Sequence, residues 1–259
     1  MASSASLQGD QRGPIPTPGP DRAAACAGSV LGSVSETVAR LRHGRPLHTT
    51  GAVCNGVLTR TGGRSGIDWV DGTGEDDVIV RLSRGGGLPS FLPDVQGLAV
   101  RAGDVDLLLA VTGRAVLGRH VLRPRRTPGG AYTSLLPFRT ARGPVLLAAL
   151  PSGRRLPAAW PEAAADLAAE PWQLRLAWAD VLGPWIVFGS LVVGGPLTAR
   201  TDEPIRFDPR RTPPGLDTYP WVDLLRGPAY VRARRGYPDA VTLAPDPERA
   251  ADDPLLETP

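Results

Sequence analysis

Residues 225–236 read LRGPAYVRARRG and bear most directly on the fold. On a helix, Arg226 and Tyr230 lie four positions apart and share one face, so the guanidinium can reach the phenol oxygen. A phenol beside a fixed positive charge ionises more readily, and tyrosinate is one recognised axial ligand of haem iron. The same spacing is common on solvated helix faces, where Arg234 and Arg235 would be surface charge. The rest of the chain must therefore decide between the two interpretations.

The composition favours a globular protein that does not bind nucleic acid. The chain has 259 residues, of which 42% are hydrophobic, enough for a substantial core. All 29 Lys and Arg positions are Arg, the net charge is only +3, and no basic run is interleaved with aromatic residues. The two cysteines, Cys26 and Cys54, indicate no disulfide framework. We find no signal-peptide pattern and no apolar run of membrane-spanning length, and we expect a cytoplasmic protein without membrane contact.

Composition also divides the chain into three parts. Residues 1–24 are rich in Ser, Gly, Pro and Gln, which predicts a disordered tail. Residues 244–259 are acidic and rich in Pro, which predicts a second disordered tail. Residues 25–243 remain as one folded domain, which begins with an amphipathic helix over 28–42.

The domain reads mainly as strands, with a helical middle. The predicted strands cover 46–60, 78–83, 96–101, 105–112, 174–179 and 185–193, the third and fourth forming a hairpin around Ala102-Gly103. Residues 132–150 favour two short helical pieces, and 161–169 favours a helix that begins at Pro161. Residues 203–221 are rich in Pro and are expected to be extended. Strands on both sides of a helical middle predict a closed, mostly antiparallel barrel with helices outside it.

Three separated motifs resemble, in one order, those of the catalase-like superfamily of haem proteins. The first is RPLHTTG at 45–51, followed by Gly56; it is similar to a stretch in which an Arg precedes the distal His by three residues. The second comprises VRLS at 80–83, PDVQGLAV at 93–100 and Asp106-Leu107. The third begins at Phe188 and Leu191 and continues with FDP at 207–209, PPG at 213–215 and residues 226–236. The resemblance implies an α+β fold, a catalase-like antiparallel β-barrel with surrounding helices, in which 25–243 is the haem-binding domain.

The resemblance also implies roles at the two faces of a haem b. Tyr230 would be the proximal iron ligand, and Arg226 would hold it as phenolate. His48 would stand over the distal face, where a neutral imidazole can take a proton from a peroxide and return it to the outer oxygen. Ser83 would hydrogen-bond His48 and set its tautomer. Alternatively, His48 is a strand histidine satisfied by the backbone and Ser83 only a small strand residue.

Arginines would hold the two propionates, because guanidinium binds carboxylate through two parallel hydrogen bonds. The candidates that the resemblance implies are Arg45, Arg81 and one of Arg234 or Arg235. Arg81 could instead be a surface cation at a strand end.

Departures from the motifs point to the substrate and the assembly. Where catalases carry an Asn beside the distal His, this chain has Leu109, Ala110 and Val111. A pocket so poor in hydrogen-bond donors favours an apolar substrate or an organic peroxide over hydrogen peroxide. The family's C-terminal helical part and long N-terminal arm have no counterpart in the sequence, so we expect a smaller assembly, such as a homodimer.

These observations predict a haem-dependent enzyme that uses peroxide or rearranges an O–O or N–O bond, with weak or no catalase activity. The alternatives are a non-catalytic haem carrier or sensor, and a barrel without cofactor that binds an apolar ligand or a protein. Cys54 follows His48 by six residues, so a regular strand would place both on one face. We expect Cys54 to be a buried structural residue rather than a reactive one.

Overall fold

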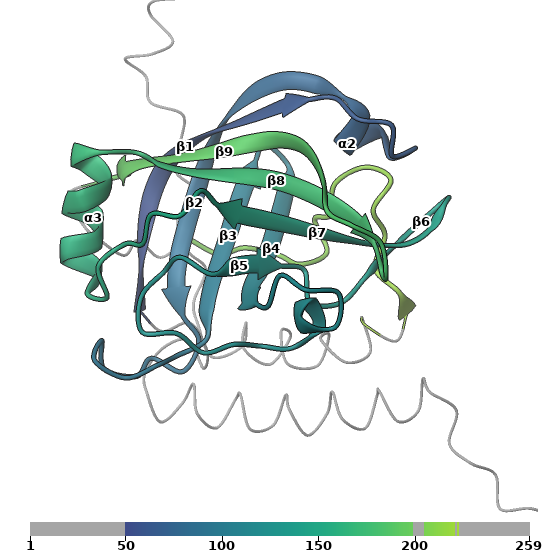
Figure 1. Cartoon of the computed structure of the whole chain (residues 1–259). Coiled ribbons are helices and arrows are strands. Elements are labelled where there is room, and N and C mark those ends of the chain that lie inside the picture. Colours follow the sequence, from purple (N-terminus) through teal and green to yellow (C-terminus); the bar gives the residue numbers. More distant parts are fainter. Residues whose placement is uncertain (1–49, 199–204, 221, 223–259) are drawn as a thin grey trace, which may run out of the picture.

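Eight antiparallel strands close into a barrel in the computed structural model, which describes residues 50–198, 205–220 and 222 (Figure 1). The first four strands run consecutively, β1 (Thr50–Thr61), β2 (Thr73–Arg84), β3 (Gln96–Ala102) and β4 (Val105–Thr112). The second four are β5 (Ala131–Thr133), β7 (Gly143–Pro151), β8 (Trp172–Asp180) and β9 (Ile186–Pro196). Pairing of β5 with β7 and of β9 with β1 closes the ring, and the short strand β6 (Phe138–Thr140) pairs with β7. The expected antiparallel barrel is confirmed.

Side chains fill the inside of the barrel. Residues alternate along each strand, so that Val80 and Leu82 of β2 face the interior with Leu98 of β3 and Leu109 of β4. Trp172 is fully buried and meets Tyr132 edge to face, with ring centroids 6.2 Å apart. A barrel of this size has room for its own side chains and little more, so its interior is a core and not a channel.

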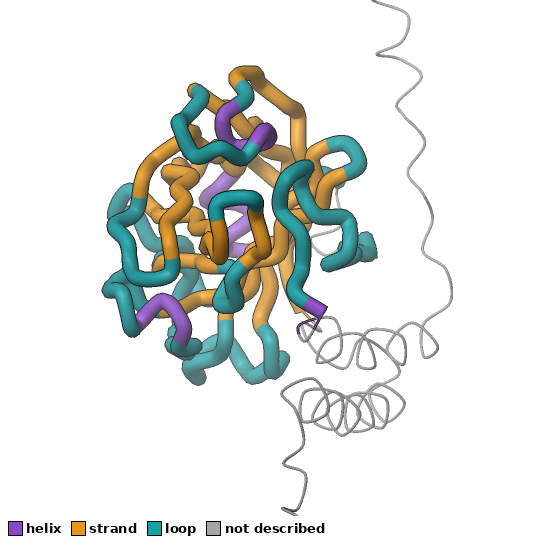
Figure 2. The backbone as a smooth tube through the Cα atoms, turned by 90° about the vertical axis from the view of Figure 1, so that its right-hand side faces the viewer, coloured by secondary structure: helices purple, strands orange, loops and turns teal. Residues whose placement is uncertain are grey.

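The described helices are short and lie outside the barrel. Helix α3 (Trp160–Ala169) carries Pro161 in its first turn and packs against β9, where Gly195 allows the backbone of Ala168 to approach closely (Figure 1). Helix α2 (Asp68–Asp71) and the 3-10 helix Gly118–His120 lie in loops between strands, and Figure 2 shows the loops around the strand wall. Among the described residues, no helix is long and apolar enough to cross a membrane.

The prediction of two helical pieces over 132–150 is wrong. This segment forms β5, β6 and β7, and the chain turns between β5 and β6 at Leu135, which adopts a φ of 62°. Residues 145–150 read VLLAAL, a run of good helix formers, but all six are buried. One side of β7 faces the barrel interior, and the other packs in a small outer cluster with Ala131, Ala177 and Trp185. Burial on both sides of the strand overrides helix propensity, and a short apolar run does not distinguish the two states.

The other element predictions within the described residues hold. The β3–β4 hairpin turns at Gly103, whose φ of 53° suits glycine, and the predicted strands near 50, 78, 174 and 186 are present. The described part is mostly strand, so the expected surrounding helices are borne out only by α2 and α3. The helix expected over 28–42 and both predicted tails lie outside the described residues, so the domain boundaries remain predictions.

Candidate functional site on the outer face of β1–β4

Of the predicted site residues, Arg81 and Ser83 lie in the described part of the chain. The others lie outside it and keep their status as predictions: Arg45, His48, Arg226, Tyr230, Arg234 and Arg235. Within residues 50–198, 205–220 and 222, no group of three or more His, Cys, Asp or Glu side chains could hold a metal ion. Tyr230, the predicted iron ligand, lies outside these residues.

Arg81 and Ser83 project from the outer face of β2, because Val80 and Leu82 between and beside them face the interior. Both residues are only 5% exposed, so this end of β2 is covered on its outer side as well. A surface cation is thereby excluded for Arg81. A buried guanidinium is stabilised only by groups that compensate its charge, which makes the position costly unless it has a structural or binding role.

Small residues surround Ser83 on this outer face. In the strand register, Gly51 of β1 lies opposite Ser83, Ser83 opposite Gly97, and Gly97 opposite Ala110. We call Gly51, Ser83, Gly97 and Ala110 the small-residue row. No side chain in the row is longer than that of serine, so the row itself projects little from the sheet.

Arg81 lies two residues before Ser83 on the same face of β2, and its guanidinium packs over Gly51. A Cβ placed on Gly51 would stand 3.1 Å from Cζ of Arg81 and 2.4 Å from the carbonyl oxygen of Leu82. Glycine at this position thus serves two purposes: it lets β1 pair closely with β2, and it leaves space for the buried cation.

Leu109, Ala110 and Val111 stand where catalases carry an Asn, and the structure places these three side chains on different faces of β4. Leu109 and Val111 face the barrel interior, where they are 5% and 0% exposed. Ala110 alone of the three lies on the outer face, as the last member of the small-residue row. The donor-poor character expected of the site therefore depends on Ala110.

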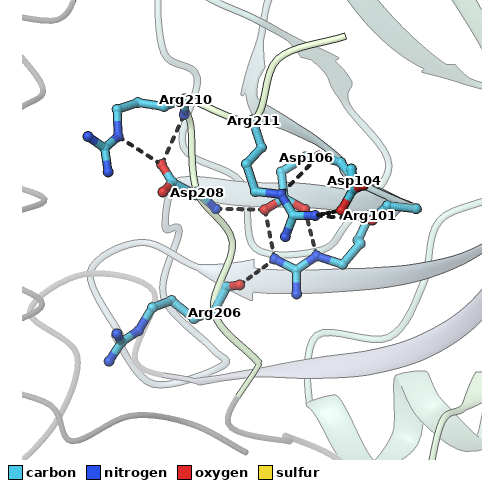
Figure 3. A network of polar contacts seen from close by, with 8 residues as sticks. Arg101, Asp104, Asp106, Arg206, Asp208, Arg210 and Arg211 are labelled. Carbon is cyan, nitrogen blue, oxygen red and sulfur yellow. Dashed lines mark hydrogen bonds and ion pairs between the residues drawn. The ribbon is translucent and has the colours of Figure 1, made fainter. Parts of the chain in front are cut away.

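The chain between 205 and 211 is attached to the same outer face by a polar network (Figure 3). The Arg101 guanidinium of β3 donates to both carboxylate oxygens of Asp106 on β4, at 2.7 Å each. The backbone N–H of Asp208 donates to the same carboxylate at 2.7 Å, and Arg101 also donates to the carbonyl of Arg206. The Arg101 guanidinium stacks over the Phe207 ring, 4.9 Å from its centroid.

A second set of contacts extends this attachment along the hairpin. The N–H of Asp106 donates to the carbonyl of Arg211 at 2.7 Å, and Arg211 donates to the carboxylate and carbonyl of Asp104 (Figure 3). The structure thereby joins FDP at 207–209, a part of the third sequence motif, to Asp106 of the second. Both lie on the face that carries Arg81 and Ser83, since Arg101 is opposite Ile79, two residues before Arg81.

Sequence reasoning missed the part that Arg101 and Asp106 play. Asp106 belongs to the second motif, which implies no role for it, and Arg101 belongs only to a predicted strand. Their partners are 105 and 102 positions away in the chain, so no local pattern could have indicated the contact.

Cys54 lies inside the barrel at 0% exposure and is a structural residue, as expected. Burial raises the pKa of its thiol to about 12, because the apolar core disfavours the thiolate. The free thiol is therefore inert near neutral pH.

The comparisons with known proteins agree with this architecture. No family model and no curated protein sequence matches the chain. Among solved structures, catalase A from Saccharomyces cerevisiae superposes with a TM-score of 0.54 at 13% identity, over 73% of this chain and 60% of the yeast chain. A fungal catalase superposes with a TM-score of 0.51 at 14% identity, over 71% of this chain and 56% of that chain. The matched part spans less than two thirds of either catalase, and identities this low show the fold alone: the described residues form a catalase-like β-barrel.

Proposed function

We propose that this chain binds haem b against the outer face of β1–β4 and uses it to process organic peroxides. One observation carries the proposal: a buried cation, Arg81, and a buried hydroxyl, Ser83, lie together on that face beside a row of small residues. The catalase-like barrel supports the same placement. The whole activity of the longer catalases is not implied by a likeness of fold.

The described residues fit such a group chemically. A flat macrocycle packs most closely on short side chains, and the longest side chain of the small-residue row is that of Ser83. Haem carries two carboxylates, and the Arg81 guanidinium is a buried, fork-shaped donor suited to one of them. The network around Asp106 holds the chain at 205–211 on this face, and Arg226 and Tyr230 follow that segment in the sequence.

Residues of this chain would ligate the iron and transfer the proton. Haem, when bound, supplies redox-active iron for O–O bond cleavage. Tyr230 would hold it as phenolate, with Arg226 stabilising the negative charge. His48 would take the proton from the inner peroxide oxygen and return it to the outer one, so that water or an alcohol leaves. Ser83 would fix the tautomer of His48.

The side chain of Ala110 would determine which peroxides are preferred as substrates. A methyl group at the outer end of the small-residue row offers no hydrogen bond to hydrogen peroxide, whereas it can contact an alkyl or aryl group. We therefore propose organic hydroperoxides as substrates and weak disproportionation of hydrogen peroxide. Rearrangement of an O–O or N–O bond uses the same residues and is the second product class to assay.

An optical spectrum of the protein loaded with haem tests the cofactor. We expect one haem per chain and a ferric Soret band that shifts or disappears in Tyr230→Phe but not in Tyr219→Phe, a tyrosine of the same segment. Absence of saturable haem binding, or equal spectra for the two variants, would refute the proposal.

Turnover separates an enzyme from a haem carrier or sensor. Cumene hydroperoxide should be consumed by the haem-loaded protein, and the rate should fall about 100-fold or more in His48→Ala, the size of a lost general acid–base group. His43→Ala serves as the matched control. Haem binding without peroxide consumption would favour the carrier.

A further inference from the structure

A pocket of about 510 Å³ opens between three loops that are distant in the sequence. Arg125 and Arg126 come from the β4–β5 connection, and Arg155 comes from the connection between β7 and α3. The hydroxyl residues Ser90 and Thr127 also line the pocket. Three arginines thus converge on one cavity whose lining contains no carboxylate.

The charge of these arginines is not neutralised within the described part of the chain. Arg125, Arg126 and Arg155 form no ion pair there. The nearby carboxylate of Asp94 is engaged elsewhere: it accepts from the N–H groups of Gly86, Leu88 and Val95 and lies 3.8 Å from Arg84. The pocket is therefore a local concentration of positive charge.

The backbone that carries the arginines is fixed. Arg125 and Asp94 exchange two backbone hydrogen bonds of 2.8 and 3.0 Å, and the Arg84 guanidinium donates to the carbonyl of Arg126 at 3.1 Å. The N–H of Leu156 donates to the carbonyl of Pro128 at 3.1 Å, which holds the segment of Arg155 against the same connection. A preformed site loses little free energy to ordering when a ligand binds.

Two glycines leave room for the side chains of Arg125 and Arg155 to pack against the backbone. A Cβ on Gly130 would stand 2.6 Å from Nε of Arg125, and a Cβ on Gly129 would stand 2.8 Å from Cγ of Arg155. Nε of Arg125 is buried and has no hydrogen-bond partner among the described residues. This atom is enclosed by the protein, so an anion in the pocket would meet the other nitrogens of the Arg125 guanidinium.

One side of the pocket is apolar. Phe91 and Ala158 line it, and Phe91 is 65% exposed although it is a large aromatic residue. Leu88 and Leu92 of the same loop are exposed as well, at 44% and 39%. Apolar side chains gathered beside convergent polar groups are typical of ligand pockets.

We propose that this pocket binds an oxyanion, a carboxylate or a phosphate, that is attached to an apolar body. The arginines bind the anion, and Phe91 with its neighbouring leucines contacts the body. The site is separate from Arg81 and Ser83, and it does not depend on haem binding.

Calorimetric titration of the full-length protein with octyl phosphate and with nonanoate tests the proposal and distinguishes the two headgroups. We expect saturable binding of at least one probe. Arg126→Gln and Arg155→Gln should each weaken it about tenfold, the effect of one charge-assisted hydrogen bond. Both side chains are exposed, so the variants should fold, which thermal unfolding checks. Arg123→Gln removes an exposed arginine of the same loop that does not line the pocket, and it should leave affinity within about twofold.

The apolar part has its own measurement. Phe91→Ser should reduce the affinity for octyl phosphate to near that for inorganic phosphate. If neither probe binds at millimolar concentration, or if Arg123→Gln weakens binding as much as Arg126→Gln, the assignment is wrong. Equal affinity for octyl phosphate and inorganic phosphate in the wild type would refute the apolar contact.

Discussion

Replacing Asp94 by Ala should destabilise the protein by about 3 kcal/mol, because this carboxylate organises the loop between β2 and β3. Asp94 is 5% exposed and accepts from three backbone N–H groups at 2.7 to 3.1 Å. Each lost bond to a buried donor costs about 1 kcal/mol, and an ion pair broken in the interior adds to that. The added cost is moderated because Arg84 keeps four carbonyl acceptors, those of Leu88, Pro89, Leu92 and Arg126.

Urea denaturation and thermal unfolding measure the effect. For a domain of this size, about 3 kcal/mol corresponds to a fall in Tm of about 6 to 12 °C. Asp94→Asn keeps one acceptor oxygen and should lose about half as much. Asp104→Ala removes a fully exposed aspartate that is also paired with an arginine, and it should leave Tm unchanged. A loss below about 1 kcal/mol for Asp94→Ala would show that the loop does not depend on this carboxylate.

Further predictions concern the barrel and the proposed site. Gly51→Ala should cost about 2 kcal/mol in chemical denaturation, because the new methyl group overlaps the neighbouring strand and the guanidinium on it, whereas Gly194→Ala, with its nearest contact at 3.7 Å, should be close to neutral. Because burial raises the pKa of Cys54 to about 12, its contribution to stability is fully present below 9.0, the pKa of an unfolded cysteine. It is lost, by up to about 4 kcal/mol, as the pH rises toward 12, and Cys54→Ala should remove that part of the alkaline slope. Asp106→Ala should cost about 3 kcal/mol and make the chain near 205–211 sensitive to limited proteolysis, since its carboxylate binds Arg101 and the chain at once. Ala110→Asn in the haem-loaded protein should raise hydrogen peroxide disproportionation about tenfold, the value of one added hydrogen bond, as followed by oxygen evolution.

The sequence predicted most of the barrel because the strand signals are local. Alternation and turn glycines mark the strands, and Gly103 marks the β3–β4 hairpin. The exception is the segment of β5, β6 and β7, and within β7 six consecutive buried residues remove the alternation that distinguishes a strand from a helix. Only the surrounding sheet and the outer cluster around Trp185 determine that segment, and neither is visible in a short window.

The sequence identified Arg81 and Ser83 as candidate site residues, but it did not predict their burial or their contacts. The motif around Arg81 and Ser83 placed both on a strand, and the structure adds that both are buried on one outer face. Contacts that join distant segments had no local signal: Arg101 reaches Arg206, and Arg125 meets Asp94 through a bridge between separate loops. Such pairings follow from the closure of the barrel, which brings loops together irrespective of their separation in the chain.

Because every basic residue other than histidine in this chain is Arg, residue type alone cannot separate a structural cation from one that binds a ligand. The hydrogen-bond partners can. Arg84 donates to four carbonyls, and Arg119 donates to the carbonyls of Asp180 and Gly183 while it stacks on Trp185 at 4.3 Å. A guanidinium whose donors are taken up by main-chain oxygens holds loops together and has little left for a ligand. Arg126 and Arg155 have exposed side chains over a cavity and no such partners among the described residues, and this difference makes the pocket, rather than Arg84 or Arg119, a place to look for a bound anion in addition to the proposed haem site.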